Sequence, residues 1–218
     1  MMKIRNILLA GAVLLTSFSC AKNDGYYDFE NTENVFDGDA IGYFQSKPGV
    51  FDSLLHVLDR LPEYKSAIQN GDLTLFCPTN ASFQLAFTNL NLVRANQKKP
   101  ALNINTLDID HLDTLLSKYV VRGHQTTDSM LFVDGLFVES LKYNQPMHAQ
   151  RLKQDASGFV GGGLVTVYYS DTKSSNFSFQ WTRTTTQAVN INTTNSLIHI
   201  LANNHEFGFG EFLNRMNK

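Results

Sequence analysis

Apolar residues recur between positions 51 and 61 at the three- and four-residue spacing of an amphipathic helix. They occupy positions i, i+3, i+4, i+7 and i+10 of one helical face: Phe51, Leu54, Leu55, Leu58 and Leu61. Pro62 interrupts the pattern, and a second short helix is predicted over 63–69, where an Asn-Gly pair provides the C-terminal cap. Another short helix is predicted over 37–45.

A compact apolar strand is predicted over 73–77. Pro78 ends it, because proline has no N–H to donate to a neighbouring strand. Thr79 and Asn80 are residue types that satisfy free amides at a helix start, so they are predicted to cap the next helix. Phe83 anchors that helix on its apolar face.

The middle of the chain predicts a polar excursion followed by one more helix. Residues 91–105 are polar and are expected to run over the surface. A helix is predicted from Asp110, and Arg122-Gly123 ends that segment. Its buried stripe consists of four residues at helical spacing: Leu112, Leu115, Leu116 and Tyr119.

Strands dominate the pattern after residue 123. Asp134-Gly135, with short apolar runs on both sides, is typical of a β-hairpin. Further strands are predicted over 164–169, 177–183 and 196–201, and a last helix over 206–216. Helices followed by strands and one closing helix indicate an α+β fold rather than alternating βαβ units, in one domain over 36–218.

The first twenty residues resemble the signal of a secreted lipoprotein. Lys3 and Arg5 precede nine apolar residues at 7–15, which as a helix would rise about 14 Å, far short of the ~30 Å bilayer core. Residues 1–19 are therefore predicted to be a signal peptide. The small residues before Cys20 resemble a bacterial lipobox, which implies that Cys20 is lipidated and becomes the first mature residue; an ordinary signal peptide with an incidental cysteine is the alternative.

Charge and composition narrow the class of partner. The chain has 18 basic and 20 acidic residues and a net charge of −2, so no basic surplus argues for a nucleic-acid partner.

Residues 20–35 are polar and acidic and predict a tether. Acidic residues directly after the lipid cysteine resemble the surface-export signal of Bacteroidota lipoproteins. We therefore expect a lipid anchor in the outer membrane that faces the exterior, with the periplasmic face as the alternative.

Three segments together resemble the fasciclin domain. Residues 73–83 are similar to the first signature of the family through Pro78, Thr79, Asn80 and Phe83. The segment 115–123, with Tyr119 and Gly123, is similar to its central motif, and 195–201, with Asn195 and His199, is similar to its second signature. The resemblance covers about 36–217 and implies helices packed on an antiparallel-rich β-sheet or wedge. It further implies a fasciclin-like surface lipoprotein of Bacteroidota.

The departures from these motifs limit what the resemblance implies. Lys118-Tyr119 stands where the family has Tyr-His, so integrin-type recognition does not transfer to this chain. Cys77 occupies the usual alanine position and is predicted to be a small core residue. His199 lies in an apolar strand, and we expect a buried imidazole bonded to backbone rather than a catalytic base.

Catalytic and metal-binding patterns are not found in the sequence. It has neither a His-Glu-x-x-His motif nor a Gly-x-Ser-x-Gly elbow, and its six histidines lack metal-ligand spacing. Gly161-Gly162-Gly163 lacks the Lys-Ser/Thr of a phosphate loop and predicts a flexible turn. We therefore expect no enzyme activity, no cofactor and no metal.

Aromatic residues favour a binding role. Phe177, Phe179 and Trp181 alternate, so a strand would place all three on one side, with the buried core as the favoured environment. Tyr168 and Tyr169 are adjacent, so one of them should point outward. Tyr169 and Trp181 are therefore candidates for stacking on a sugar ring.

Two functions follow. The first is adhesion or protein interaction at the cell envelope. The alternative is an accessory glycan-binding component of an outer-membrane polysaccharide-uptake system. Ser129, in Asp128-Ser129-Met130, resembles the short O-glycosylation signal of the same bacteria and is predicted to be accessible.

Overall fold

The structure, a computed structural model, describes residues 35–153 and 163–218. The predicted signal peptide, Cys20, most of the tether, Gly161 and Gly162 lie outside the described residues. The helices are α2 (Ala40–Gln45), α3 (Asp52–Arg60), α4 (Pro62–Asn70), α5 (Asn80–Asn96), η1 (Ile104–Thr106), α6 (Ile109–Ser117), η2 (Ser178–Gln180) and α7 (Phe212–Met216). The strands are β1 (Leu73–Cys77), β2 (Val120–Arg122), β3 (Leu136–Glu139), β4 (Pro146–Lys153), β5 (Val165–Asp171), β6 (Thr182–Asn192) and β7 (Ser196–Leu201).

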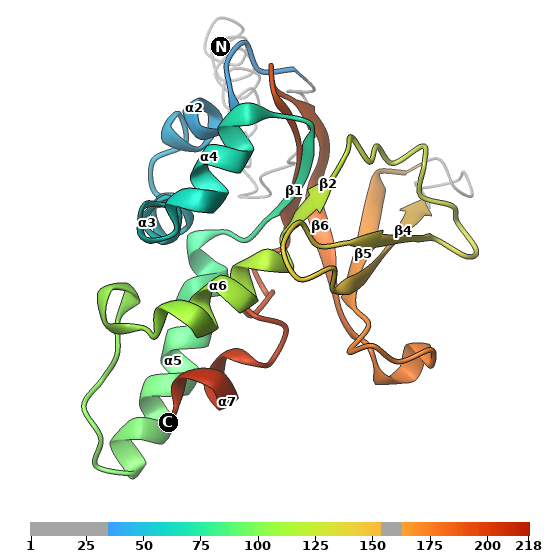
Figure 1. Ribbon diagram of the computed structural model, residues 1–218. Coiled ribbons are helices and arrows are strands. Elements are labelled where there is room, and N and C mark those ends of the chain that lie inside the picture. Colours follow the sequence, from blue (N-terminus) through green and yellow to red (C-terminus); the bar gives the residue numbers. More distant parts are fainter. Residues whose placement is uncertain (1–34, 154–162) are drawn as a thin grey trace, which may run out of the picture.

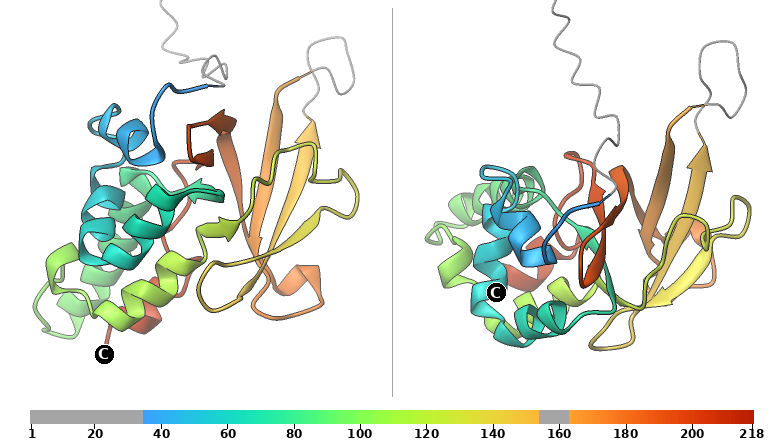
Figure 2. Two further views of the ribbon diagram at one scale, coloured as in Figure 1. Left: turned by 45° about the horizontal axis from the view of Figure 1, so that its top comes forward. Right: turned by 90° about the horizontal axis from the view of Figure 1, so that it is seen from above.

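The α-helices gather on one side of the molecule and the sheet forms the other side (Figures 1 and 2). The seven strands form one sheet in the order β2-β1-β7-β6-β5-β4-β3. The β1–β7 pair is parallel, and every other neighbouring pair is antiparallel. The expected α+β fold with helices on an antiparallel-rich sheet is confirmed.

The sheet curls until its two outer strands meet. Val121 of β2 forms a bridge with Ser140, directly after β3, and Leu141 donates its N–H to the Val120 carbonyl at 2.8 Å. This contact pairs backbone groups of both edge strands, which would otherwise be available to another chain.

The first three helices are where the hydrophobic pattern predicts them. The Asp39 side chain accepts from the Gly42 N–H at 2.6 Å and caps α2. Pro62 separates α3 from α4 by standing in the first turn of α4, where its missing N–H costs no hydrogen bond. Gly71 follows α4 with φ of 94°, a conformation that favours glycine.

The predicted caps of α5 are wrong in detail. Thr79 precedes the helix, but its hydroxyl donates to Asn203 Oδ1 at 3.0 Å instead of capping a free amide. Asn80 Oδ1 accepts from the Ser53 N–H at 2.8 Å, so this side chain caps an earlier helix, α3. Asn80 therefore begins α5 with its backbone and joins that helix to α3 with its side chain.

The polar run 91–105 is only partly a surface excursion. Helix α5 continues to Asn96, and the chain then folds back along it. Asn91 on the helix exchanges two hydrogen bonds with the Leu102 backbone, at 2.8 and 2.9 Å, and the buried Arg94 donates Nε to the Pro100 carbonyl at 2.8 Å. Polar side chains thus hold the return segment, which apolar periodicity cannot reveal.

The predicted hairpin at Asp134-Gly135 is wrong. Strand β3 pairs with β4, and the connecting turn lies at 140–145, where Tyr143 and Asn144 have φ of 66° and 47°. Gly135 serves close packing instead: a Cβ there would come within 2.4 Å of the His148 ring.

Two further predictions fail near the C-terminus. Residues 177–183 do not form one strand, because η2 occupies 178–180 and β6 begins only at Thr182. The last helix is α7 alone, since Gly208, Phe209 and Gly210 all have positive φ and turn the chain before it. Within the described part of the chain, no helix has the length and apolar content that a membrane span requires.

Candidate binding site

The three segments that resemble fasciclin motifs form neighbouring strands. β1 lies between β2, which follows Tyr119, and β7, which follows Asn195. Pro78 ends β1, and the buried Phe83 stacks on Phe207 with ring centroids 4.4 Å apart. These residues are therefore structural.

Gly123 and Asn195 hold turns at the ends of these strands. Gly123 has φ of 72° and donates its N–H to the Asp72 carbonyl at 2.9 Å. Asn195 accepts from the Ala40 N–H at 3.0 Å and donates to the Ile68 carbonyl at 2.9 Å. The Asn195 side chain thereby ties α2 and α4 to the strand β7.

His199 is buried and bonded to backbone, as predicted. Its Nδ1 accepts from the Asn190 N–H at 3.2 Å, so Nε2 carries the proton that is donated to the Gln125 carbonyl at 3.0 Å. Burial lowers the pKa of His199 to about 4, although the bond to Gln125 opposes this shift. The imidazole is neutral at physiological pH, and both of its nitrogens are engaged.

Tyr119 and His205 form a second buried pair. The Tyr119 hydroxyl accepts from the Gly208 N–H at 2.7 Å and lies 2.7 Å from His205 Nε2. Among the described residues the hydroxyl has no other hydrogen-bond partner, so we assign its proton to the bond with Nε2 and the proton of the neutral imidazole to Nδ1. Burial lowers the pKa of His205 to about 3, so the neutral form persists at physiological pH. The sequence motifs do not include His205.

Tyr169 cannot stack on a sugar. It is fully buried, its ring lies parallel to Phe76 with centroids 3.6 Å apart, and its hydroxyl donates to the Lys118 carbonyl at 2.5 Å. The prediction that Tyr169 stacks on a glycan is therefore wrong. Tyr168 is the outward-facing member of the pair and is half-buried.

Lys118, the departure from the central motif, forms a buried ion-pair network. Its side chain is 2% exposed, and Nζ contacts Asp171 Oδ2 at 2.6 Å and Glu211 Oε1 at 2.7 Å. Lys173 contacts the same two carboxylates. Partial burial would raise the pKa of Glu211, but hydrogen bonds from lysine and arginine outweigh it and lower the pKa to about 2. The network ties the 207–211 turn to β5.

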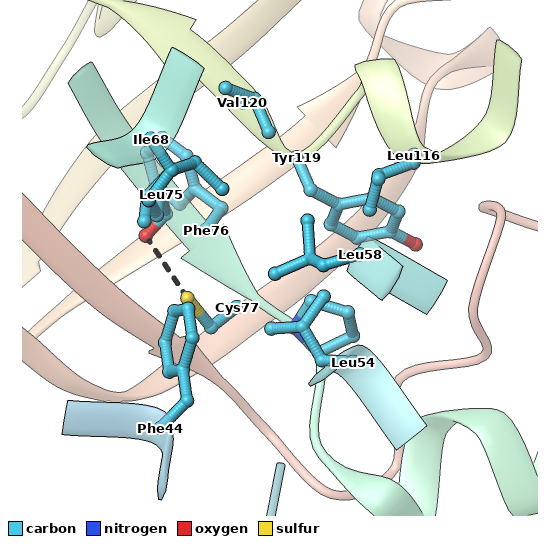
Figure 3. A pocket seen from close by; sticks show the side chains of 11 residues that line it. Phe44, Leu54, Leu58, Ile68, Leu75, Phe76, Cys77, Leu116, Tyr119 and Val120 are labelled. Atoms are coloured by element: carbon cyan, nitrogen blue, oxygen red, sulfur yellow. Dashed lines mark hydrogen bonds between the residues drawn. The ribbon is translucent and has the colours of Figure 1, made fainter. Parts of the chain in front are cut away.

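An apolar cavity in the core is too small to hold a ligand. Figure 3 shows the side chains of α2, α3, α6 and β1 converging around it, with Cys77 among them. Its volume of about 10 Å³ is about that of one water probe. Cys77 is buried, as predicted, and burial raises the pKa of its thiol, so it is a packing residue rather than a reactive one.

An aromatic patch lies on the strand side of the molecule. We define it as Phe137, Phe177, Phe179 and Trp181. Phe137 and Phe177 are each 62% exposed and Phe179 is 81% exposed, so the favoured prediction of a buried environment for 177 and 179 is wrong. Trp181 is half-buried and packs edge-on to Phe137, with centroids 5.8 Å apart.

A polar cleft of about 300 Å³ lies where β5 and β6 meet the turn after β7. Tyr168 and Arg183 line its strand side, and Asn204, His205, Glu206 and Gly210 line its turn side. The Arg183 guanidinium lies over the Tyr168 ring, 4.9 Å from its centroid. No sequence motif pointed to this cleft.

Two further predictions concern chemistry and modification. Among the residues that the structure describes, no three histidine, cysteine, aspartate or glutamate side chains converge as a metal site would require. Ser129 is exposed as predicted, and its hydroxyl donates to the Thr126 carbonyl at 2.7 Å.

Comparison with known proteins gives weak similarity to solved structures. No protein-family model matches the chain, and no curated protein is similar to it in sequence. Among solved structures, the chain is similar to a FAS1 domain pair from the insect cell adhesion molecule fasciclin I. The TM-score is 0.43 at 12% identity, and the match covers 72% of this chain and 45% of that one. Membership of the fasciclin family therefore stays a proposal.

Proposed function

We propose that this chain is a non-catalytic, fasciclin-like interaction module, attached through Cys20 to the outer membrane and facing the exterior. The observation that carries the proposal is the aromatic patch. The patch consists of two ring pairs, Phe137 with Trp181 and Phe177 with Phe179. Clustered exposed aromatic side chains are uncommon on monomeric proteins, and aromatic residues are enriched in protein interfaces. A protein partner is the occupant that such a surface favours.

The patch is held in place before any partner binds. Trp181 donates its indole N–H to the Ser175 carbonyl at 2.8 Å, and the Ser175 hydroxyl contacts Gln180 Oε1 at 2.5 Å. These bonds fix the segment that presents Phe177 and Phe179, whose centroids are 5.6 Å apart. A preorganised pair of aromatic anchors loses little side-chain entropy on binding.

The position of the patch suits an anchored protein. Strand β6 begins next to Trp181 and ends at Asn192, where Val35 forms a parallel bridge with it. Its 11 residues span roughly 30 Å at the usual rise of a strand. The described chain thus begins at one end of β6 and Trp181 lies next to the other end, which favours a patch that faces away from the membrane.

A paired substitution tests the patch. Phe177→Ser with Phe179→Ser should lower attachment of expressing cells to immobilised matrix proteins (collagen and laminin) and to one another by about ten-fold, because both anchors are lost. Leu92→Ser is the matched control, since Leu92 is 63% exposed on α5 and lies outside the patch. Attachment that is equal in all three proteins would contradict the proposal.

Fractionation tests the anchor. Wild-type chain should sediment with outer membranes and be digested by protease added to intact cells. Cys20→Ala should remove the acylation site and release the chain from membranes, whereas Cys77→Ala should leave fractionation unchanged. Wild-type protein free of acyl chains in the medium would refute the anchor.

The glycan alternative keeps one of its two sequence-based residues. Tyr169 is buried, whereas Trp181 is half-buried and packs against Phe137 and against His148, with centroids 4.8 Å apart in the latter pair. Stacking of a sugar ring on Trp181 therefore stays a prediction.

A further inference from the structure

We propose that the cleft between Arg183 and His205 binds the carboxylate of a monosaccharide-sized uronate. This site is separate from the aromatic patch, so the inference goes beyond the protein-interaction function. Three features meet at one cleft and support it: a guanidinium without a carboxylate partner among the described residues, an imidazole N–H on the cleft wall, and a polar turn.

The first feature is the direction of the His205 proton. Since Nε2 accepts from Tyr119, Nδ1 is a donor, and among the described residues no acceptor bonds to it. His205 is only 5% exposed yet lines the cleft. Nδ1 is not among the buried polar atoms that lack a partner within the described residues, so it reaches the water of the cleft, and a ligand acceptor can replace that water.

The second feature is the fixed guanidinium. Arg183 is exposed and lies over the Tyr168 ring, which restricts its position. Within residues 35–153 and 163–218, no carboxylate pairs with it. Its planar set of N–H donors matches a carboxylate in bidentate geometry.

The third feature is the rest of the lining, which restricts the ligand. Glu206 adds one negative charge opposite the single arginine, and its Oε2 accepts from Asn89 Nδ2 at 3.0 Å. The Glu206 charge opposes any anion, but it opposes a dianion such as phosphate more strongly than a monocarboxylate, which one arginine can match. Thr185 and Asn204 offer a hydroxyl and an amide to ligand hydroxyl groups.

Size agrees with this class of ligand. At about 300 Å³ the cleft lies at the lower end of the range for small-molecule sites. It can take one sugar ring rather than a folded partner. A hydroxylated ring that carries one carboxylate uses both the arginine and the neutral polar groups.

Calorimetric titration of the full chain in detergent tests the proposal. Glucuronate or galacturonate should bind, and glucose, the matched neutral sugar, should bind about ten-fold more weakly or not at all. Acetate carries a carboxylate without a sugar ring, and it should also bind more weakly than the uronates. Equal binding of glucose would overturn the role of Arg183, and equal binding of acetate would overturn the saccharide class.

Variants assign the binding to the cleft. Arg183→Gln should weaken uronate binding about ten-fold or more. Arg183→Lys should bind uronate more tightly than Arg183→Gln but more weakly than wild type, because lysine keeps the charge and lacks the planar pair of N–H donors. Arg122→Gln, at another exposed arginine, should leave binding unchanged. Phe177→Ser with Phe179→Ser should also leave uronate binding unchanged, which keeps this test independent of the patch. Absence of uronate binding by the folded wild-type chain would refute the proposal.

Discussion

At the scale of single residues, the core holds two imidazoles in fixed tautomers. His199 accepts at Nδ1 and His205 accepts at Nε2, so their protons point in directions set by their neighbours. Burial is the main cause of the low pKa of both, since it disfavours the charged form. Such groups link folding stability to pH.

We expect the free energy of unfolding to fall as the pH falls from 6.5 to 5. In the unfolded chain both histidines bind protons near their ordinary pKa of 6.5, whereas in the fold they stay neutral until about pH 4 and about pH 3. The contribution of the two neutral histidines to the free energy of unfolding is therefore fully present above pH 6.5. It declines below that pH by about 1.4 kcal/mol per pH unit for each histidine.

Urea unfolding at pH 7 and pH 5 measures this loss. The exposed His124 provides the control, and His124→Gln should lose as much stability as wild type. Equal stability at the two pH values would contradict the assignment of buried neutral histidines.

Residue-scale prediction from sequence succeeded where a side chain lies within an apolar strand. The burial of His199 and Cys77 followed from their apolar neighbours. His205 was missed because it lies in a polar Asn-Asn-His run without periodicity. The choice between Tyr168 and Tyr169 was wrong because alternation places adjacent residues on opposite faces without saying which face is buried.

At the scale of elements, Asn80 couples two helices. Its side chain caps α3 through the Ser53 N–H, and its Nδ2 donates to Asp52 Oδ2 at 2.9 Å. Its own backbone begins α5. One residue of the first fasciclin-like segment thus sets how α3 and α5 meet.

Asn80→Ala should lower the free energy of unfolding by about 1 kcal/mol, the usual cost of losing an N-terminal cap. Asn80→Asp keeps an acceptor for Ser53 but loses the donor to Asp52, and should be less stable than wild type because two carboxylates would then face each other. Thermal unfolding of both variants measures the effect. An Asn80→Ala protein as stable as wild type would show that the side chain does not cap α3.

Helices and strands with a strong apolar pattern were predicted from the sequence. Those stabilised mainly by pairing with neighbouring strands or by local hydrogen bonds were not. Helices α3 and α4 and strands β1, β5 and β7 are close to their expected ranges. Strand β6 was missed because most of its side chains are polar, and its pairing with β5 and β7 provides the stability. The segment 177–180 alternates like a strand but forms η2, which the bond from Trp181 to Ser175 favours.

At the scale of the whole molecule, the α-helices and η2, which carries Phe179 of the aromatic patch, lie on different sides. The helices pack against one side of the sheet, while η2 projects from the strand side (Figure 2). The described chain enters at Val35, beside the far end of β6. This arrangement supports a module that is held at one end and binds with the other.

Site-specific photocrosslinking tests the central claim, that the aromatic patch binds a protein partner. A photoreactive phenylalanine at position 179 of the full chain, in intact cells, should give one discrete, protease-sensitive crosslinked species. The same group at position 92 should give none, since Leu92 is exposed on α5 outside the patch. A pattern at position 179 that is no different from position 92 would contradict the account.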